Sequence, residues 1–312
     1  MRCAVSTLFE NDYHLGTAAL ANSLVQNGFT GVIWAGYRGP APTWAQQGRR
    51  DGDALVITLA PDAELRLVPV ESPLHFAHYK PWFMLRVLEE LDPSADAVFY
   101  FDPDIVVPTR WSYYVEWVGY GVALTEDNHY HVGVDHPLRH AWKQFAHDNH
   151  LTVTRDLSRF CNSGFLGVQR AHASFLRTWC DLIRAVEPES GSLAGWRSLD
   201  RTHRFWSANQ DTLNLAAMVT PHPVAVYGPN GMDFVPSAGR PIMSHAVDKP
   251  KPWRRHYLRD FFRGRPPTRP DRWFWRYVEG PLPVFTHRRA RQQQTCIRLA
   301  AFLSRFYHRP EA

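Results

Sequence analysis

Apolar and polar positions follow two different periods along the chain. Short apolar runs typical of buried strands occur at 2–8, 31–37, 54–59, 64–70, 97–101, 121–127 and 160–170. Longer stretches with apolar residues three or four positions apart, typical of amphipathic helices, occur at 13–29, 77–91, 136–150, 171–187 and 209–219. Strands that alternate with helices indicate the α/β class, with an open, largely parallel sheet flanked by helices.

Two carboxylates follow one of these strands directly. Asp102 and Asp104 come after the apolar run 97–101, and a second apolar run, 105–107, begins at once. Ligands bind beyond the carboxyl ends of the strands in such sheets. A buried charge is costly unless a positive group meets it, so we expect a cationic partner at this position.

Three hypotheses explain this pair. Asp-Pro can simply open a turn. Two hard oxygen ligands with one residue between them can instead share a divalent cation, Mn²⁺ or Mg²⁺, that also binds a diphosphate. In a phosphatase, Asp102 would be the nucleophile and Asp104 the acid/base. That chemistry needs a second acidic pair, and no Asp-Asp or Gly-Asp-x-x-x-Asp follows position 104, so the phosphatase is less favoured.

Five segments occur in a characteristic order: STLFENDYHLGTAALANSL, FYFDPDIVV, FCNSGFLGV, SANQDTLN and MSHAVDKPKPW. Together they resemble the family 8 glycosyltransferases, the glycogenin and bacterial galactosyltransferase group, over most of residues 2–255. The resemblance implies the GT-A-type nucleotide-diphospho-sugar transferase fold. It also implies transfer of a hexose from a nucleoside diphosphate sugar, with a UDP-sugar as the expected donor, to an acceptor hydroxyl with retention of anomeric configuration.

The same resemblance assigns the metal and diphosphate residues. Asp102, Asp104 and His245 match the family's metal ligands, and an imidazole in the set favours Mn²⁺ over Mg²⁺. Lys251 matches the lysine that stabilises the departing diphosphate. Asp248 stands where the family usually has glycine. An extra carboxylate there would repel a diphosphate, which leaves open a non-catalytic nucleotide-sugar-binding protein.

Further positions match contacts to the donor. Asn162 and Asp211 match contacts to its sugar, Lys80 a basic residue near it, and the base and ribose would lie against Thr7, Leu8, Asn11 and Tyr13. Each assignment has a plainer alternative. Asp211 could cap a helix, Asn11 could be a turn residue, and Lys80 could be a solvated helix lysine. Trp206 and Trp253 lie near the motifs and are candidates for stacking on a sugar.

Composition narrows the classes of partner. The net charge of +5, nearly all from arginine, suits phosphate-bearing ligands or an anionic membrane and is too small to indicate nucleic acid. Four widely separated cysteines suggest neither a zinc site nor a disulfide framework. No apolar run approaches the roughly 20 residues of a membrane span. We therefore expect a cytoplasmic protein.

The composition changes near the C-terminus. Residues 1–255 form the expected catalytic domain, and 256–312 form a Pro/Arg/Trp-rich, irregular appendage that ends in an amphipathic helix. In that helix Cys296, Leu299, Leu303 and Phe306 share one face, with Arg291, Arg298 and Arg305 beside it. The helix could pack on the catalytic domain. It could instead hold the enzyme at the inner face of a membrane, near a carbohydrate or lipid-linked acceptor.

Overall fold

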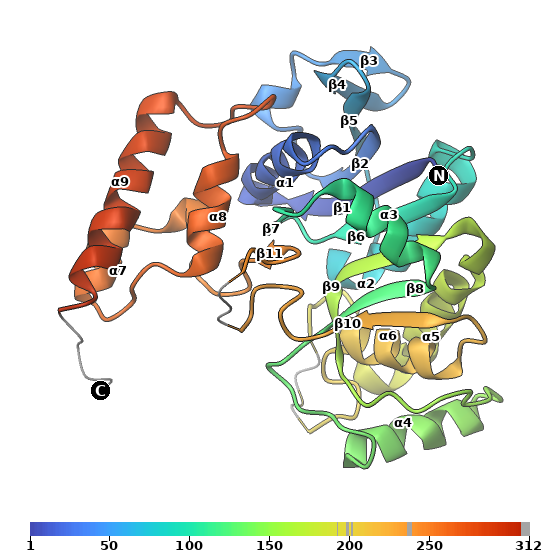
Figure 1. Ribbon diagram of the computed structural model, residues 1–312. Coiled ribbons are helices and arrows are strands. Elements are labelled where there is room, and N and C mark those ends of the chain that lie inside the picture. Colours follow the sequence, from blue (N-terminus) through green and yellow to red (C-terminus); the bar gives the residue numbers. More distant parts are fainter. Residues whose placement is uncertain (192, 198–199, 201, 236–238, 307–312) are drawn as a thin grey trace.

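A nine-stranded sheet forms the centre of the protein in the computed structural model, which describes residues 1–191, 193–197, 200, 202–235 and 239–306 (Figure 1). Its strand order is β10-β8-β9-β6-β1-β2-β5-β4-β3. The strands are β1 (Cys3–Glu10), β2 (Gly31–Arg38), β3 (Arg49–Asp51), β4 (Ala54–Ala60), β5 (Ala63–Pro69), β6 (Ala97–Phe101), β8 (Val122–Glu126), β9 (Cys161–Gln169) and β10 (Val224–Tyr227). A separate two-stranded sheet pairs β7 (Ile105–Val106) with β11 (Ser244–His245).

The α/β class is confirmed, and the sheet is mixed in direction. Strands β6, β1, β2 and β5 are parallel neighbours, as β8 and β10 are. Strand β9 runs antiparallel between β6 and β8, and β3 and β4 add two antiparallel pairings at the far edge. The expected parallel arrangement therefore holds only for part of the sheet. An apolar run indicates burial on both faces and carries no information about strand direction.

Helices cover both faces of the sheet. Helices α1 (His14–Gln26) and α3 (Trp111–Gly119) lie on one face, while α2 (Phe76–Arg86), α5 (Ser174–Ser190) and α6 (Ala208–Val219) lie on the other, with α4 (Pro137–Asp148) beside α6. Shorter turns are 3₁₀-helices at Asn11–Tyr13, Thr43–Ala45, Arg170–His172 and Pro252–Arg254, and a π-helical turn at Val87–Leu91.

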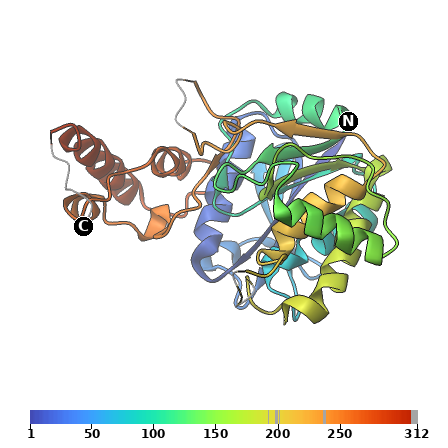
Figure 2. The ribbon, with the colours of Figure 1, turned by 90° about the horizontal axis from the view of Figure 1, so that it is seen from below.

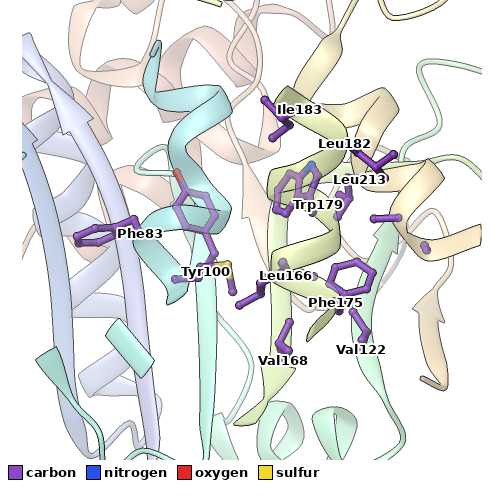
Figure 3. Packing of buried hydrophobic residues seen from close by; sticks show 14 of the residues in the cluster. Phe83, Tyr100, Val122, Leu166, Val168, Phe175, Trp179, Leu182, Ile183 and Leu213 are labelled. Carbon is purple, nitrogen blue, oxygen red and sulfur yellow. The ribbon is translucent and has the colours of Figure 1, made fainter. Parts of the chain in front are cut away.

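Strand β6 is buried on both sides. Val98 and Tyr100 face the core under α2, α5 and α6, whereas Phe99 and Phe101 face the core under α1 and α3. Figure 3 shows the first of these cores, where Tyr100 lies among side chains from the sheet and the helices above it. This double burial explains the unbroken apolar run before Asp102, and it fixes the end of the strand rigidly.

The C-terminal segment is more regular than its composition suggested. It contains α7 (Tyr257–Phe262), α8 (Arg269–Tyr277) and α9 (His287–Leu303), which project from the α/β body in Figure 2. Thr268 and Asp271 form a capping box at the start of α8. Proline in the first helical turn is compatible with a helix, so the proline-rich composition did not preclude one. Residues 307–312 lie outside the described part, and the division at residue 255 stays a prediction.

Candidate metal centre

The Asp102-Pro103-Asp104 segment makes a tight turn at the end of β6. The Ile105 amide donates to the Asp102 carbonyl at 3.0 Å, and the Asp102 amide donates to the Gly164 carbonyl of β9 at 2.8 Å. The turn hypothesis is thus correct as far as the backbone goes. The Asp104 side chain is only 8% exposed, so turn formation does not account for a carboxylate at this position.

His245 reaches this turn through the small second sheet. Strands β7 and β11 pair antiparallel, with His245 opposite Ile105. The His245 Nε2 atom lies 3.1 Å from Asp104 Oδ1 and 3.9 Å from Asp102 Oδ2. One ligand atom from each of the three residues lies within 4.8 Å of the others. The structure therefore brings the three predicted metal residues together, and we call this cluster the candidate metal centre.

Lys80 is a buried partner of this centre. Its Nζ lies 2.8 Å from Asp102 Oδ1 and donates to the Ser163 carbonyl at 2.9 Å. The Tyr100 hydroxyl donates to the same Asp102 oxygen at 3.1 Å. Lys80 is 3% exposed, so it is not the solvated helix lysine that was the alternative. It holds Asp102 Oδ1 and leaves Oδ2 directed toward His245.

Lys251 has an equivalent position beside Asp104. Its Nζ lies 2.7 Å from Asp104 Oδ2 and donates to the carbonyls of Ala246 and Val247. An ammonium group has three donors, and these three contacts use them all. In this conformation Lys251 orients Asp104, and it must exchange one of these bonds to reach a phosphate.

Neighbouring positive charges and burial shift the pKa of Asp104 in opposite directions. Burial alone would raise the pKa of its carboxyl, but His245 and Lys251 lower that pKa well below the usual range. Asp104 is therefore ionised at neutral pH. An ionised carboxylate is the state that ligates a metal.

Gly164 leaves the space in which these groups meet. A Cβ atom at this position would lie 2.6 Å from the His245 ring, 2.8 Å from Asn162 Oδ1 and 3.0 Å from Asp102 Oδ2. Any side chain there would push into the centre. Two carboxylates and an imidazole around such a space form a donor set that fits a divalent cation such as Mn²⁺.

The centre opens into a cavity of about 570 Å³. Of the residues predicted from the sequence, those that line the cavity are Leu8, Tyr13, Lys80, Asp102, Asp104, Asn162, His245 and Lys251. Thr7, Asn11 and Asp211 are not part of the lining. Thr7 is buried within β1, and Asn11 is an exposed residue with a φ of 54°, which agrees with the turn alternative.

A network of polar side chains lies beside the centre and also lines the cavity. Asp127 Oδ2 accepts hydrogen bonds from Asn162 Nδ2 at 2.8 Å and from Gln210 Nε2 at 2.9 Å. The Ser163 amide donates to Gln210 Oε1, and Asn209 Nδ2 donates to the Ser163 hydroxyl at 2.8 Å. We call these five residues the polar cluster. Their amide and carboxyl groups suit a hydroxylated ligand.

Asp211 has the role of a helix cap. Its Oδ2 accepts a hydrogen bond from the Ser207 amide at 2.8 Å, at the N-terminus of α6. Burial raises the pKa of the Asp211 carboxyl to about 7. The assignment of Asp211 as a sugar contact has no support in this geometry, because neighbouring Asn209 and Gln210 line the cavity instead.

We expect Asp211→Asn to stabilise the protein at pH 8 and to have little effect at pH 4. The folded-state pKa of Asp211 is raised, so stability is lost as pH rises from the unfolded value of 3.8 to about 7. An asparagine keeps an acceptor for Ser207 and does not ionise. The gain at pH 8 should be about 4 kcal/mol at most, from the difference between the folded and unfolded pKa values. Denaturant unfolding at both pH values measures it, and a gain independent of pH would contradict it.

Neither tryptophan singled out for sugar stacking lines the cavity. Trp253 is buried in the core between α1 and α8, and its Nε1 donates to Asp12 Oδ2. Trp206 packs against the guanidinium group of Arg197. Trp196 lines the cavity instead and is 48% exposed. Spacing to a motif did not distinguish these rings, since the side on which each one lies depends on tertiary packing.

Sequence reasoning also missed Asp127 and Gln210. Asp127 is the last residue of the predicted strand 121–127 and directly follows β8, as Asp102 follows β6. A polar residue at the carboxyl end of a strand is the signal that could have found it. Asp248, the carboxylate that raised doubt, is exposed and lines the cavity, with no ion pair in the described part of the chain.

A comparison of the sequence with protein-family models found no match, and a comparison with curated proteins found none either. The arguments for function therefore come from the site and from the sequence motifs.

Proposed function

We propose that the protein is a metal-dependent glycosyltransferase. It would transfer a hexose from a nucleoside diphosphate sugar, with UDP as the expected nucleotide, to a hydroxyl of a carbohydrate or lipid-linked acceptor. The observation that carries this proposal is the meeting of Asp102, Asp104 and His245 at the end of β6, beside a polar cluster in one cavity. The motif order that resembles family 8 glycosyltransferases adds the GT-A fold and retention to the proposal.

The charges of the centre suit a diphosphate only together with a cation. Lys80 and Lys251 already balance the two carboxylates. A diphosphate would add negative charge beside Asp104, where the interior amplifies repulsion. Mn²⁺ or Mg²⁺, held by Asp102, Asp104 and His245, would supply the missing positive charge and stabilise the leaving group.

Side chains of the protein would position the metal ligands and bind the donor sugar. Lys80 and Tyr100 hold Asp102, and Lys251 holds Asp104 and lies near the expected diphosphate. The polar cluster offers Asp127 and Asn162 to the sugar hydroxyls. No side chain is assigned as a general base, since the departing phosphate can accept the proton of the acceptor hydroxyl.

The charged groups around Asp104 favour this proposal over a phosphatase. A phosphatase would use Asp104 as the proton donor, which requires a carboxyl with a pKa near or above the working pH. The pKa of Asp104 lies below its ordinary value because His245 and Lys251 stabilise the anion. The anionic form suits a metal ligand.

Thermal denaturation with nucleotides tests the proposal. We expect UDP to raise the melting temperature only when Mn²⁺ is present, because the metal joins the diphosphate to the carboxylates. ADP, GDP and free phosphate serve as comparisons. Indifference to every nucleotide with and without metal would contradict the proposal. Tight UDP binding with no transfer to any acceptor would favour a non-catalytic nucleotide-sugar-binding protein.

The C-terminal helices support a proposed membrane contact. Helix α9 buries Ala290, Ile297 and Ala300. The side chains it leaves exposed include Leu299, Phe302 and, just beyond it, Phe306. Exposed Arg298 and Arg305 are next to Leu299 and Phe306 in the sequence. The packed face thus differs from the predicted apolar face. In the described part of the chain, no helix is long and apolar enough to cross a bilayer. Exposed aromatic rings with interspersed arginines suit the surface of an anionic membrane.

We expect the protein to co-sediment with anionic vesicles at low salt and to be released by high salt. Arg298→Glu with Arg305→Glu should abolish this binding, since each arginine contributes about 1 kcal/mol near an anionic surface. Neutral vesicles are the control for charge. Equal sedimentation of the parent protein and the double variant would contradict the contact.

A further inference from the structure

Two of the cationic side chains that line the cavity form no ion pair with any described residue. Four cationic lysine and arginine side chains line it, and Lys80 and Lys251 are bonded to the carboxylates of the candidate metal centre. The other two are Arg197 and Lys249. Within the described part of the chain, neither makes a hydrogen bond or an ion pair. The cavity thus has cationic groups beyond those that the metal centre uses.

Arg197 is held in place by aromatic rings. Its guanidinium carbon lies 4.1 Å from the ring centroid of Trp196 and 4.1 Å from that of Trp206. Its Nε atom is buried and has no hydrogen-bond partner among the residues that the structure describes. Stacking restrains the plane of a guanidinium and leaves its N–H groups available, and such a fixed fork matches the geometry of a carboxylate or phosphate.

The nearby acid does not neutralise Arg197. Asp211 interacts electrostatically with Arg197, but its Oδ2 is bonded to the Ser207 amide and no ion pair joins the two side chains. Burial raises the pKa of Asp211 to about 7, so a substantial fraction of this carboxyl is uncharged at neutral pH. Among the described residues, Arg197 therefore retains a positive charge that no carboxylate pairs with directly.

A second stacked arginine shows what a purely structural role looks like. The Arg276 guanidinium carbon lies 5.3 Å from the Trp273 ring centroid, and it also has no ion pair within the described residues. Arg276 is exposed to solvent and outside the cavity, so water satisfies its donors. Arg197 differs because its Nε is inaccessible and its side chain lines the cavity.

Lys249 adds charge at the same ring. Its Nζ lies 5.9 Å from the Trp196 ring centroid, and its side chain is exposed at the cavity. A ligand that lies against Trp196 would therefore meet the ammonium of Lys249 and the guanidinium of Arg197. The diphosphate has the metal centre with Lys251, so these two cations are available to a different anion.

We propose that the acceptor of the transfer reaction carries an oxyanion, a carboxylate or a phosphate, which Arg197 and Lys249 bind beside Trp196. This inference rests on the proposed function and adds the substrate class to it. A charge-assisted hydrogen bond of this kind is worth roughly ten- to a hundredfold in affinity. A neutral sugar in the same place would offer hydroxyl oxygens as acceptors but no negative charge to meet Arg197 and Lys249.

Calorimetric titration with matched sugars tests the proposal. The parent protein is saturated with UDP and Mn²⁺, so that the diphosphate site is filled, and is then titrated with glucose 6-phosphate, glucuronate or glucose. We expect at least one anionic sugar to bind about tenfold or more tightly than glucose. The two anionic arms distinguish phosphate from carboxylate. Arg197→Gln should remove the preference, and Arg276→Gln should keep it.

Two results would overturn the proposal. One is equal affinity of the parent protein for all three sugars. The other is an Arg197→Gln variant that retains the preference for anionic sugars, or that weakens UDP as much as it weakens them, which would make Arg197 a donor contact. The UDP titration is recorded separately, and the sugar titrations are repeated without UDP. If UDP did not bind, that result would contradict the proposed function. The sugar titrations without UDP would still show whether Arg197 selects anionic sugars.

Discussion

Asp104→Asn is expected to reduce Mn²⁺-dependent sugar transfer, or hydrolysis of the UDP-sugar, by at least about a hundredfold, on the scale of losing a main charge stabiliser. Asparagine keeps the shape of the side chain and removes the anion that faces His245 Nε2 at 3.1 Å. It also leaves Lys251 without its carboxylate partner. Electron paramagnetic resonance of bound Mn²⁺ should show weakened metal binding in parallel with the loss of activity.

Folding must be measured beside activity, because the removal of one member of a buried ion pair can cost about 3 to 5 kcal/mol. Circular dichroism and the melting temperature of Asp104→Asn give that measurement. Asp181→Asn is the matched control, since the Asp181 side chain is 71% exposed and is not part of the cavity lining. Undiminished transfer by a folded Asp104→Asn protein in Mn²⁺ would rule out Asp104 as a ligand.

Gly164→Ala is expected to lower Mn²⁺ affinity by about ten- to a hundredfold, the range for groups that orient metal ligands, with a comparable or larger loss of transfer. The added methyl group would lie 2.6 Å from the His245 ring and 3.0 Å from Asp102 Oδ2. Both side chains would have to move apart. The backbone of β9 accepts alanine, so the strand itself should persist.

Gly133→Ala provides the control for this substitution. A Cβ at position 133 meets nothing within 4 Å, so the same chemical change there should alter neither metal affinity nor transfer. The titration of Mn²⁺ into each variant separates the two positions. If Gly164→Ala bound Mn²⁺ like the parent protein, His245 and Asp102 would not share a metal at this place.

The pattern of apolar residues in the sequence predicted much of the architecture. The run 97–101 is apolar because β6 lies between two layers of helices, and the periodic stretches are the helices of those layers. Such patterns depend on local geometry, since the side-chain period of a strand or helix is set by its backbone. Strand direction was not predictable in this way, and β9 lies antiparallel to β6.

The candidate site was likewise predictable from the sequence only in part. The position of Asp102 and Asp104 at a strand end was visible in the sequence, and it placed two carboxyl groups at the carboxyl end of β6. His245 joins them only because β11 pairs with β7, and Lys80 because α2 packs over β6 and β9. Neither pairing leaves a periodic signal in the chain, since long-range contacts depend on how whole elements pack.

Residue roles near the motifs were decided by tertiary structure alone. Asp211 and Gln210 are adjacent in the sequence, yet one caps α6 and the other lines the cavity. The helical period turns successive side chains by about 100°, so a motif match cannot tell which of two neighbours faces a ligand. Likewise, Arg197 was one arginine among many in the sequence. Trp196 is adjacent to Arg197 in the sequence, but the stacking of the Trp196 and Trp206 rings on its guanidinium and the burial of its Nε exist only in the folded protein.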